Sequence, residues 1–74
     1  MDLKPKACKA AVERLAPRQR EVLRLLADGL PRKNIADQLG IAEGTVGVHC
    51  EAIYARLGVS SVVQAVVVYA KAGF

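Results

Sequence analysis

Several features of enzymes and exported proteins are missing from this sequence. Its 74 residues leave room for one domain with one small core, and not for a catalytic domain joined to a regulatory one. Two cysteines, Cys8 and Cys50, are too few for a disulfide framework and lack metal-ligand spacing, so we expect two reduced thiols. No apolar run approaches the ~18 residues that cross a membrane, and the first residues do not resemble a secretory signal. The sequence therefore predicts a cytoplasmic globular protein without a membrane partner.

Catalytic groupings are absent as well. The sequence has no nucleophile placed beside a base, no glycine-rich phosphate loop and no carboxylate pair. The only histidine, His49, is followed directly by Cys50, and neighbouring residues on a helix point about 100° apart. This pair is a poor candidate for a metal site or a catalytic thiol, so we expect no enzyme, no metal and no cofactor.

Charge is distributed unevenly along the chain. The formal net charge is +4 and the calculated isoelectric point is about 9.4. Residues 1–33 hold nine Lys or Arg against four Asp or Glu, whereas residues 34–74 hold two against three. A basic balance permits a polyanionic partner, and the positive field comes from the first half of the chain.

Glycine and proline divide the sequence into short helical segments. Residues 6–15 favour a short helix. A second helix begins at Pro17, which suits a first helical position, and carries an apolar stripe as far as Leu30. Gly29 fits the position just past its end, and Pro31 stops continuation and suits the start of the next helix. Together with the segments that follow, this pattern predicts an all-α domain.

The next two predicted helices are separated by a tight turn. The first of them ends at Gly40, where the turn needs a residue at positive φ, and the apolar Ile41 closes the helix end. Ala36 is small enough to let the following helix cross close by. That helix is predicted over Glu43–Leu57, and Gly58 stops it.

The last predicted helix begins at Ser61, because Ser61 and Gln64 have the spacing of a capping box. The body of this segment is apolar on nearly every side. Because a run of valines also suits a buried strand, composition alone does not decide between a helix and a strand. A helix that is apolar on every face cannot bury its whole apolar surface in so small a core. The sequence therefore predicts that the remaining apolar surface contacts a second copy of the chain. The alternative is that the valines only fill the core. The candidate dimerisation residues are Val62, Val63, Val66, Val67 and Ala70.

Two short helices joined by a glycine turn form a helix-turn-helix, whose second helix can lie in the DNA major groove. Glycine turns also join helices in plain bundles, so this pattern alone is of moderate specificity. Six motifs follow in fixed order: LAPRQREVLRLLADG over residues 15–29, Ile35-Ala36, Leu39-Gly40-Ile41, Thr45-Val46, Val48-His49 and Arg56-Leu57-Gly58-Val59. Together they resemble the LuxR-type (NarL/FixJ-like) DNA-binding domain of bacterial transcription regulators, from residue 15 to about residue 70.

The resemblance implies a four-helix domain over residues 15–74, preceded by a tail or a short extra helix over residues 1–14. It implies binding to double-stranded DNA with the helix over residues 43–57 in the major groove, and a homodimer through the last helix. Two copies would contact half-sites about one helical turn apart. Such a domain stands alone or ends a longer regulator such as a response regulator, and RNA polymerase or another regulator is a further partner. The fourth region of sigma factors has a similar pattern but usually lacks the His at position 49 and the Leu-Gly-Val before a long last helix.

The sequence departs from the family in the helix expected to enter the groove. Gly47 stands where Lys is common, Cys50 where Arg is frequent, and Ala52 where Asn is common. Glu51 occupies a variable position that is basic in some members. A carboxylate repels phosphates and in the groove accepts only from cytosine or adenine amino groups, so these departures reduce the expected contacts with DNA.

The same helix is expected to be weak at its start. Ala42 replaces a capping Ser, which costs about 1 kcal/mol, and Gly44 and Gly47 each cost about 1 kcal/mol relative to Ala. Ala16 likewise replaces a capping Thr before the helix at Pro17. We expect residues 44–48 to fray in the free protein.

Candidate DNA-binding residues follow from the resemblance and from charge. Two basic residues open a helix, where their charge and the backbone N–H groups can hold a phosphate together. A threonine hydroxyl and a further arginine can contact the backbone, and a valine can contact a thymine methyl group. For each charge the alternative is a solvated surface residue, and for His49 it is a packed histidine bonded to backbone. The candidate set is Arg32, Lys33, Thr45, Gly47, Val48, Glu51 and Arg56.

Two functions remain open from the sequence. The first is a DNA-binding transcription regulator domain that binds promoter DNA as a dimer. The second is an interaction module that dimerises or docks on another regulator with weak or no sequence-specific DNA binding. Gly47, Glu51 and the valine-rich last helix favour the second, and salt-dependent binding to DNA distinguishes the two.

Overall fold

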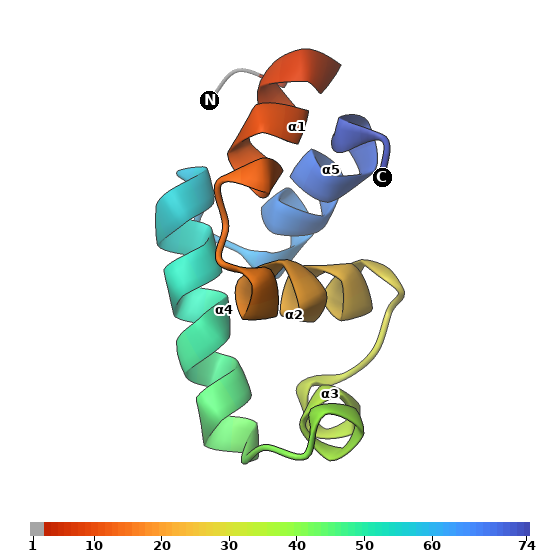
Figure 1. The fold of residues 1–74 in the computed structure, drawn as a ribbon, viewed down its shortest axis with the longest axis vertical. Coiled ribbons are helices and arrows are strands. Elements are labelled where there is room, and N and C mark those ends of the chain that lie inside the picture. The colour runs from red at the N-terminus through yellow and green to blue at the C-terminus, as the bar shows by residue number, and fades with distance from the viewer. Residues whose placement is uncertain (1–2) are drawn as a thin grey trace.

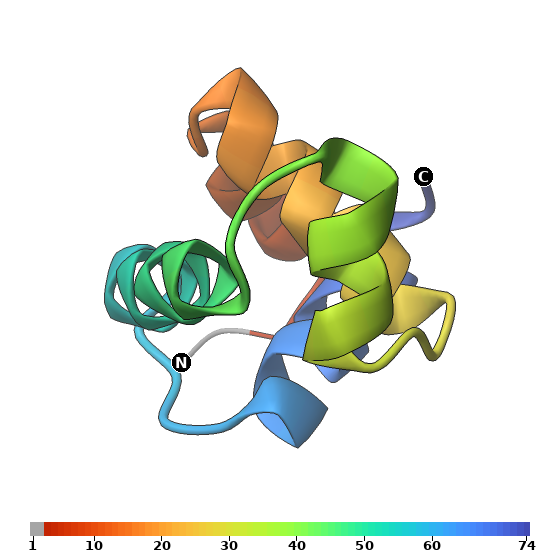
Figure 2. The same cartoon turned by 90° about the horizontal axis from the view of Figure 1, so that it is seen from below.

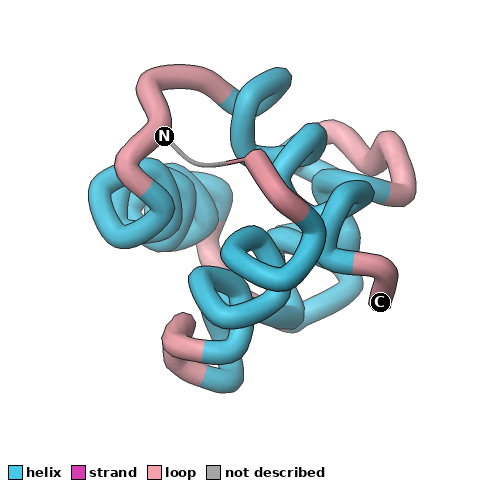
Figure 3. The backbone as a smooth tube through the Cα atoms, turned by 90° about the horizontal axis from the view of Figure 1, so that it is seen from above, coloured by secondary structure: helices cyan, strands magenta, loops and turns pink. Residues whose placement is uncertain are grey.

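The structure, a computed structural model, describes residues 3–74, and these residues form five helices without any strand (Figure 1, Figure 3). The helices are α1 Pro5–Glu13, α2 Pro17–Ala27, α3 Arg32–Leu39, α4 Glu43–Leu57 and α5 Val62–Ala72. The predicted all-α class is confirmed, and the strand that composition left open for the valine run is wrong. Met1 and Asp2, the first part of the predicted tail, lie outside the described residues.

Most helix ends lie at or near the predicted positions, because proline and glycine fix them locally. The helix α4 has the predicted bounds, whereas α1 spans Pro5–Glu13 instead of residues 6–15. Pro31 precedes α3 as its N-cap, with extended backbone (φ −63°, ψ 155°), and is not the first helical residue. A proline there supplies a fixed φ without belonging to the helix.

The start of α5 carries the predicted cap in modified form. The Oγ of Ser61 accepts the backbone N–H of Gln64 at 3.3 Å, as a serine cap does. The Oε1 of Gln64 accepts the N–H of Ser60 at 2.7 Å, where a standard capping box would use the N–H of Ser61. The two side chains still fix the chain direction into α5.

One hydrophobic core joins all five helices. Leu23 of α2, Ile35 of α3, Ile53 of α4 and Val68 of α5 are fully buried in it. The helix α1 packs chiefly against α5, alongside which it lies in Figure 1, and buries Cys8 in the same core. The extra N-terminal helix is therefore continuous with the core of the remaining four.

Residues 3–74 include neither a single membrane-spanning helix nor a metal-binding group of side chains. No single helix there is long and apolar enough to cross a membrane, and only α4 and α5 taken together reach that length and apolarity, with a bend of 62° between them. The same residues contain no group of three or more His, Cys, Asp or Glu side chains that could hold a metal ion.

Candidate nucleic-acid interface

The helices α3 and α4 form a helix-turn-helix, seen from the side of its turn in Figure 2. Val46, Cys50, Ile53 and Leu57 of α4 are all buried, at spacings of three and four residues. Residues with this spacing share one face of a helix, so their burial fixes the rotation of α4 about its own axis. The opposite face of α4 is consequently turned outward.

That outward face of α4 is mostly apolar and small. Val48 is 69% exposed, and Gly44, Glu51 and Ala55 are also exposed. The predicted site residues Val48 and Glu51 therefore lie where a groove of DNA can reach them. An exposed Val suits contact with a thymine methyl group, whereas the small neighbours leave few hydrogen-bonding groups for bases.

On the α3 side of α4, Arg32 reaches from the first turn of α3 to the middle of α4. A Cβ added at Gly47 would lie 3.6 Å from Nη1 of Arg32, which is ordinary van der Waals contact. The missing side chain of Gly47 thus leaves space that the guanidinium group borders. The sequence had placed Arg32 at a phosphate, and the structure places it beside α4.

The titration behaviour of Arg32 agrees with this position. Its pKa is raised, chiefly by a side-chain hydrogen bond with Tyr54, and the charges of Cys50 and Glu51 act in the same direction. The pKa of the Tyr54 hydroxyl is also raised, because burial disfavours the phenolate more than Arg32 favours it. Arg32, Gly47, Glu51 and Tyr54 therefore form one cluster along α4.

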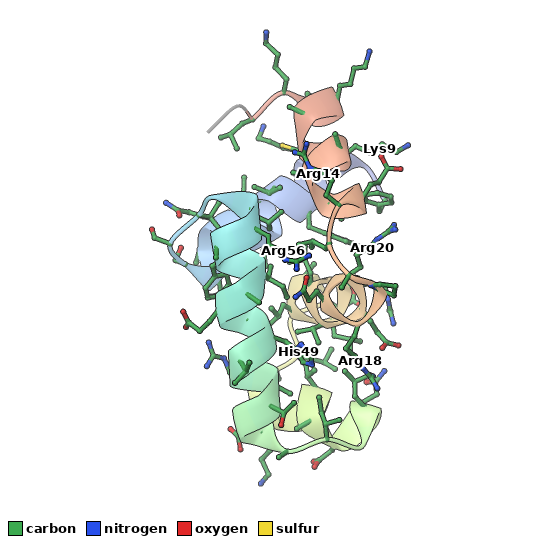
Figure 4. The ribbon with its side chains drawn as sticks, turned by 60° about the vertical axis from the view of Figure 1, so that its left-hand side comes forward. Lys9, Arg14, Arg18, Arg20, His49 and Arg56 are labelled. Atoms are coloured by element: carbon green, nitrogen blue, oxygen red, sulfur yellow. The ribbon has the colours of Figure 1, made fainter. Side chains whose placement is uncertain are left out.

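On the α2 side of α4, a second group of basic side chains is present. Figure 4 shows His49 and Arg56 pointing from α4 toward the side on which α2 lies, with Arg14 and Arg18 on the neighbouring helix ends. Arg56 is exposed and His49 is half-buried. Arg18 is engaged in an ion pair with Glu21, whose Oε1 accepts from Nη1 at 2.9 Å.

The remaining predicted phosphate contacts are accessible. Lys33, in the first turn of α3, and Thr45, in the first turn of α4, are both exposed. Neither helix has a side chain that caps its N-terminal N–H groups, because Pro31 and Ala42 hold the cap positions. Such uncapped N–H groups are able to donate to an anion. The outward face of α4 thus lies between basic residues on both sides.

Four of the five predicted dimerisation residues lie on α5 outside the core, and the fifth, Val66, packs partly against it. Val63 is 69% exposed, Val62 40% and Val67 39%, while Val66 is half-buried and Ala70 is exposed. An open hollow of about 530 Å³ adjoins this face and is lined by Val63 and Val67 together with Leu3 and Val59. The core takes other residues of α5, so the structure leaves the predicted face uncovered.

Sequence reasoning missed two groupings. Tyr54 was not singled out, although its spacing of seven from Gly47 puts both on one side of α4. Phe74 was also missed: its ring stacks on Tyr69 with centroids 5.9 Å apart. Nζ of Lys9 and Cζ of Arg20, two basic residues from the first half of the chain, lie 5.7 Å and 5.3 Å from the centroid of the Phe74 ring. These contacts link α1 and α2 to α5, which is distant from both in sequence.

The fold and the outward-facing helix define the helix-turn-helix class of DNA-binding domains. Residues 13–69 match the family described as "Bacterial regulatory proteins, luxR family", and the chain belongs to that family. The family consists of DNA-binding transcription regulators and is not a class of enzymes. The resemblance seen in the sequence is therefore confirmed.

Curated relatives agree with the family assignment. The nitrate/nitrite response regulator protein NarL of Escherichia coli K12 is 45% identical over 56 residues, covering 76% of this chain and 26% of NarL. The Fimbriae Z protein of the same strain is 42% identical over 57 residues, covering 77% of this chain and 27% of the relative. A putative HTH-type transcriptional regulator of Mycobacterium tuberculosis H37Rv, Rv0890c, is 44% identical over 52 residues, 70% of this chain and 6% of the relative. The chain spans about a quarter or less of these proteins. No solved structure matches it.

Proposed function

We propose that this chain binds promoter DNA as a dimer, with α4 in the major groove. The observation that carries the proposal is the outward face of α4, exposed at Val48 and bordered by basic residues on both sides. A helix of this length fits the major groove, and basic residues beside it neutralise phosphates on the two strands. Binding to chromosomal DNA would place the protein in the bacterial cytoplasm.

Within this complex the residues divide into two groups. Lys33, Thr45 and Arg56 contact phosphates, because they are exposed and lie on either side of the outward face of α4. Val48 contacts base edges through its methyl groups. Phosphate contacts supply most of the affinity, and few groups on α4 itself supply specificity.

The dimer forms through α5 of each copy. Val62, Val63 and Val67 are large apolar side chains that stay exposed in the monomer, and a two-fold axis through them buries the same patch on both copies. Two copies of α4 would then lie in successive major grooves about one helical turn apart. In this arrangement the domain serves as the output part of a response regulator or a related regulator, with RNA polymerase or another regulator as a further partner.

The test measures affinity for DNA selected from a random pool, at several salt concentrations. The logarithm of the affinity should fall with the logarithm of salt at a slope of about −0.9 per phosphate contact. Lys33→Ala and Arg56→Ala should each weaken binding to all sequences and make the slope shallower by about one unit per contact. Lys71→Ala, which removes an equal charge near the end of α5, is the matched control and should leave the slope unchanged.

The interaction-module alternative makes the opposite prediction. Gly47 and Glu51 favour it because Gly47 offers no side chain to the bases and the Glu51 carboxylate repels phosphates. A chain that dimerises by sedimentation but binds no DNA at low salt would establish the alternative and refute the proposed function. Sedimentation and DNA binding are therefore measured on the same preparation.

A further inference from the structure

The gap that Gly47 leaves in α4 is bordered by a side chain from another helix. Nη1 of Arg32 lies at contact distance from the place where a side chain of residue 47 would begin. Arg32 is itself the first residue of α3, so its guanidinium reaches α4 across the helix-turn-helix. The positive group at this point of α4 is supplied by α3.

Arg32 also changes the charge that α4 presents. Glu51, one turn beyond Gly47, is exposed and on its own repels the phosphates of DNA. The charge of Glu51 makes the smallest of the contributions to the raised pKa of Arg32, so the attraction between the two groups is weak. Arg32 therefore offsets the carboxylate only in part, and its main contribution is a positive group beside Gly47.

The position of the guanidinium decides what it can contact. Gly47 lies in the N-terminal half of α4, the part of a recognition helix that goes deepest into the major groove. A group beside Gly47 enters the groove with the helix, and Tyr54 on the same side of α4 has the largest effect on the Arg32 pKa. An arginine in the groove forms two parallel hydrogen bonds with O6 and N7 of guanine.

From this geometry we infer that Arg32 acts as a base-contacting residue of α4 and selects a guanine in each half-site. The inference rests on the proposed function and makes it more specific. It replaces the phosphate contact that the sequence alone gave to Arg32. A phosphate contact by Arg32 is the alternative, and it becomes an outcome of the test.

The first experiment compares binding to the selected site and to every single base-pair substitution of it. Arg32→Ala should lower the preference for one G·C pair per half-site by about 5- to 150-fold and leave the other preferences unchanged. Arg32→Lys keeps the charge without the paired hydrogen bonds and should lose most of the same preference. Lys33→Ala removes the neighbouring charge and is the matched control. It should lower the affinity for all DNA sequences equally.

A second pair of variants tests the role of the gap itself. Gly47→Ala adds one methyl group at ordinary contact distance and should leave the guanine preference in place. Gly47→Leu fills the space beside the guanidinium and should reduce that preference as Arg32→Ala does. Equal preference profiles for Gly47→Leu and the unaltered chain would overturn the inference.

A third measurement needs no DNA. Because the interaction with Arg32 lowers the Tyr54 pKa against the effect of burial, Arg32→Ala should raise that pKa further, as followed by ultraviolet absorbance. Lys33→Ala should not change it. An unaltered Tyr54 titration in Arg32→Ala would show that Arg32 does not interact with Tyr54 of α4, and it would overturn the inference without affecting the proposed function.

The outcomes separate the two proposals. If the unaltered chain binds DNA and Arg32→Ala weakens all sequences equally, Arg32 contacts a phosphate and the inference is wrong while the proposed function stands. If the unaltered chain binds no DNA, the proposed function is wrong, and the inferred contact of Arg32 with a base is wrong as well.

Discussion

The backbone N–H of Ile41 donates to the carbonyl oxygen of Ala36 at 3.0 Å, and this bond closes the turn between α3 and α4. The turn passes through Gly40, whose φ of +68° lies in the left-handed region. Ala36 is 4% exposed, so the bond lies at the point where the two helices come together. The direction of α4 relative to α3 depends on this turn.

Gly40→Ala is expected to lower the free energy of unfolding by about 1–2 kcal/mol, the cost of a left-handed residue that carries a Cβ. A Cβ at Gly40 meets no atom within 4 Å, so the cost comes from backbone conformation and not from a clash. Gly44→Ala is the matched control, because its Cβ is equally uncrowded but Gly44 is helical. It should stabilise by about 1 kcal/mol, and urea denaturation of both variants measures the difference. Equal effects would contradict this account of the turn.

The start of α4 offers a second prediction. Ala42 is the N-cap residue with extended backbone, and its side chain cannot accept a hydrogen bond. Ala42→Ser is expected to stabilise by about 1 kcal/mol and to slow amide hydrogen exchange over residues 44–48. Ala55→Ser, an exposed change later in the same helix, should not stabilise because it caps nothing. In the unaltered chain, protection over residues 44–48 as strong as that of Ile53 would contradict the expected fraying.

Much of the fold was predictable because the residues that begin and end its helices act locally. Gly40 and Gly58 end helices through their own φ, and Pro17 begins one, so neighbouring residues alone fix these limits. The exposure of Val48 was predictable too, since the buried series on α4 determines which residues face outward. The local sequence pattern was sufficient to predict those features that depend on a single helix.

The Arg32 cluster could not be predicted in the same way. Its contact with Gly47 joins two helices, and the distance depends on how they cross. The stacking of Phe74 on Tyr69, with Arg20 above it, depends on how α5 lies against α2. Periodicity fixes the face on which a side chain lies, but it does not fix which side chain of another helix meets it.

Two equally exposed valines separate dimerisation from DNA contact. Val63 on α5 and Val48 on α4 are each 69% exposed, so a charge at either position should not disturb the core. Val63→Asp is expected to shift the dimer toward monomer in sedimentation and to weaken DNA binding indirectly. Val48→Asp should leave the dimer intact and weaken DNA binding directly. A dimer unaffected by Val63→Asp would exclude this part of α5 as the interface.

Tyr54 gives a prediction for the dependence of stability on pH. Burial raises its pKa in the folded chain above the ~10 of an unfolded tyrosine, so the folded state holds its proton more tightly. The stability from this shift is complete below pH ~10 and is lost as the pH rises through the folded value. The free energy of unfolding should therefore decline above pH ~10, and less steeply in Tyr54→Phe. If the free energy of unfolding declined equally in both proteins above pH ~10, the raised pKa of Tyr54 would be contradicted.

The last prediction concerns the charge of Glu51. Its carboxylate is exposed on α4 and is attracted by Arg32, so its role in the groove is either general repulsion or recognition of one base. We expect repulsion: Glu51→Ala should raise the affinity for all DNA sequences severalfold at low salt, with a smaller gain at high salt because the repulsion is screened. The guanine preference of Arg32 should persist, since its contacts with Gly47 and Tyr54 remain.

Glu13→Ala is the control for this change, because it removes an exposed carboxylate from the end of α1. It should alter DNA affinity less than Glu51→Ala, since Glu13 lies outside the helix-turn-helix. Binding is measured against all single base-pair substitutions of the selected site. If Glu51→Ala abolishes the preference at one C·G or A·T pair and leaves affinity otherwise unchanged, the carboxylate accepts a hydrogen bond from a base amino group, and repulsion is the wrong account.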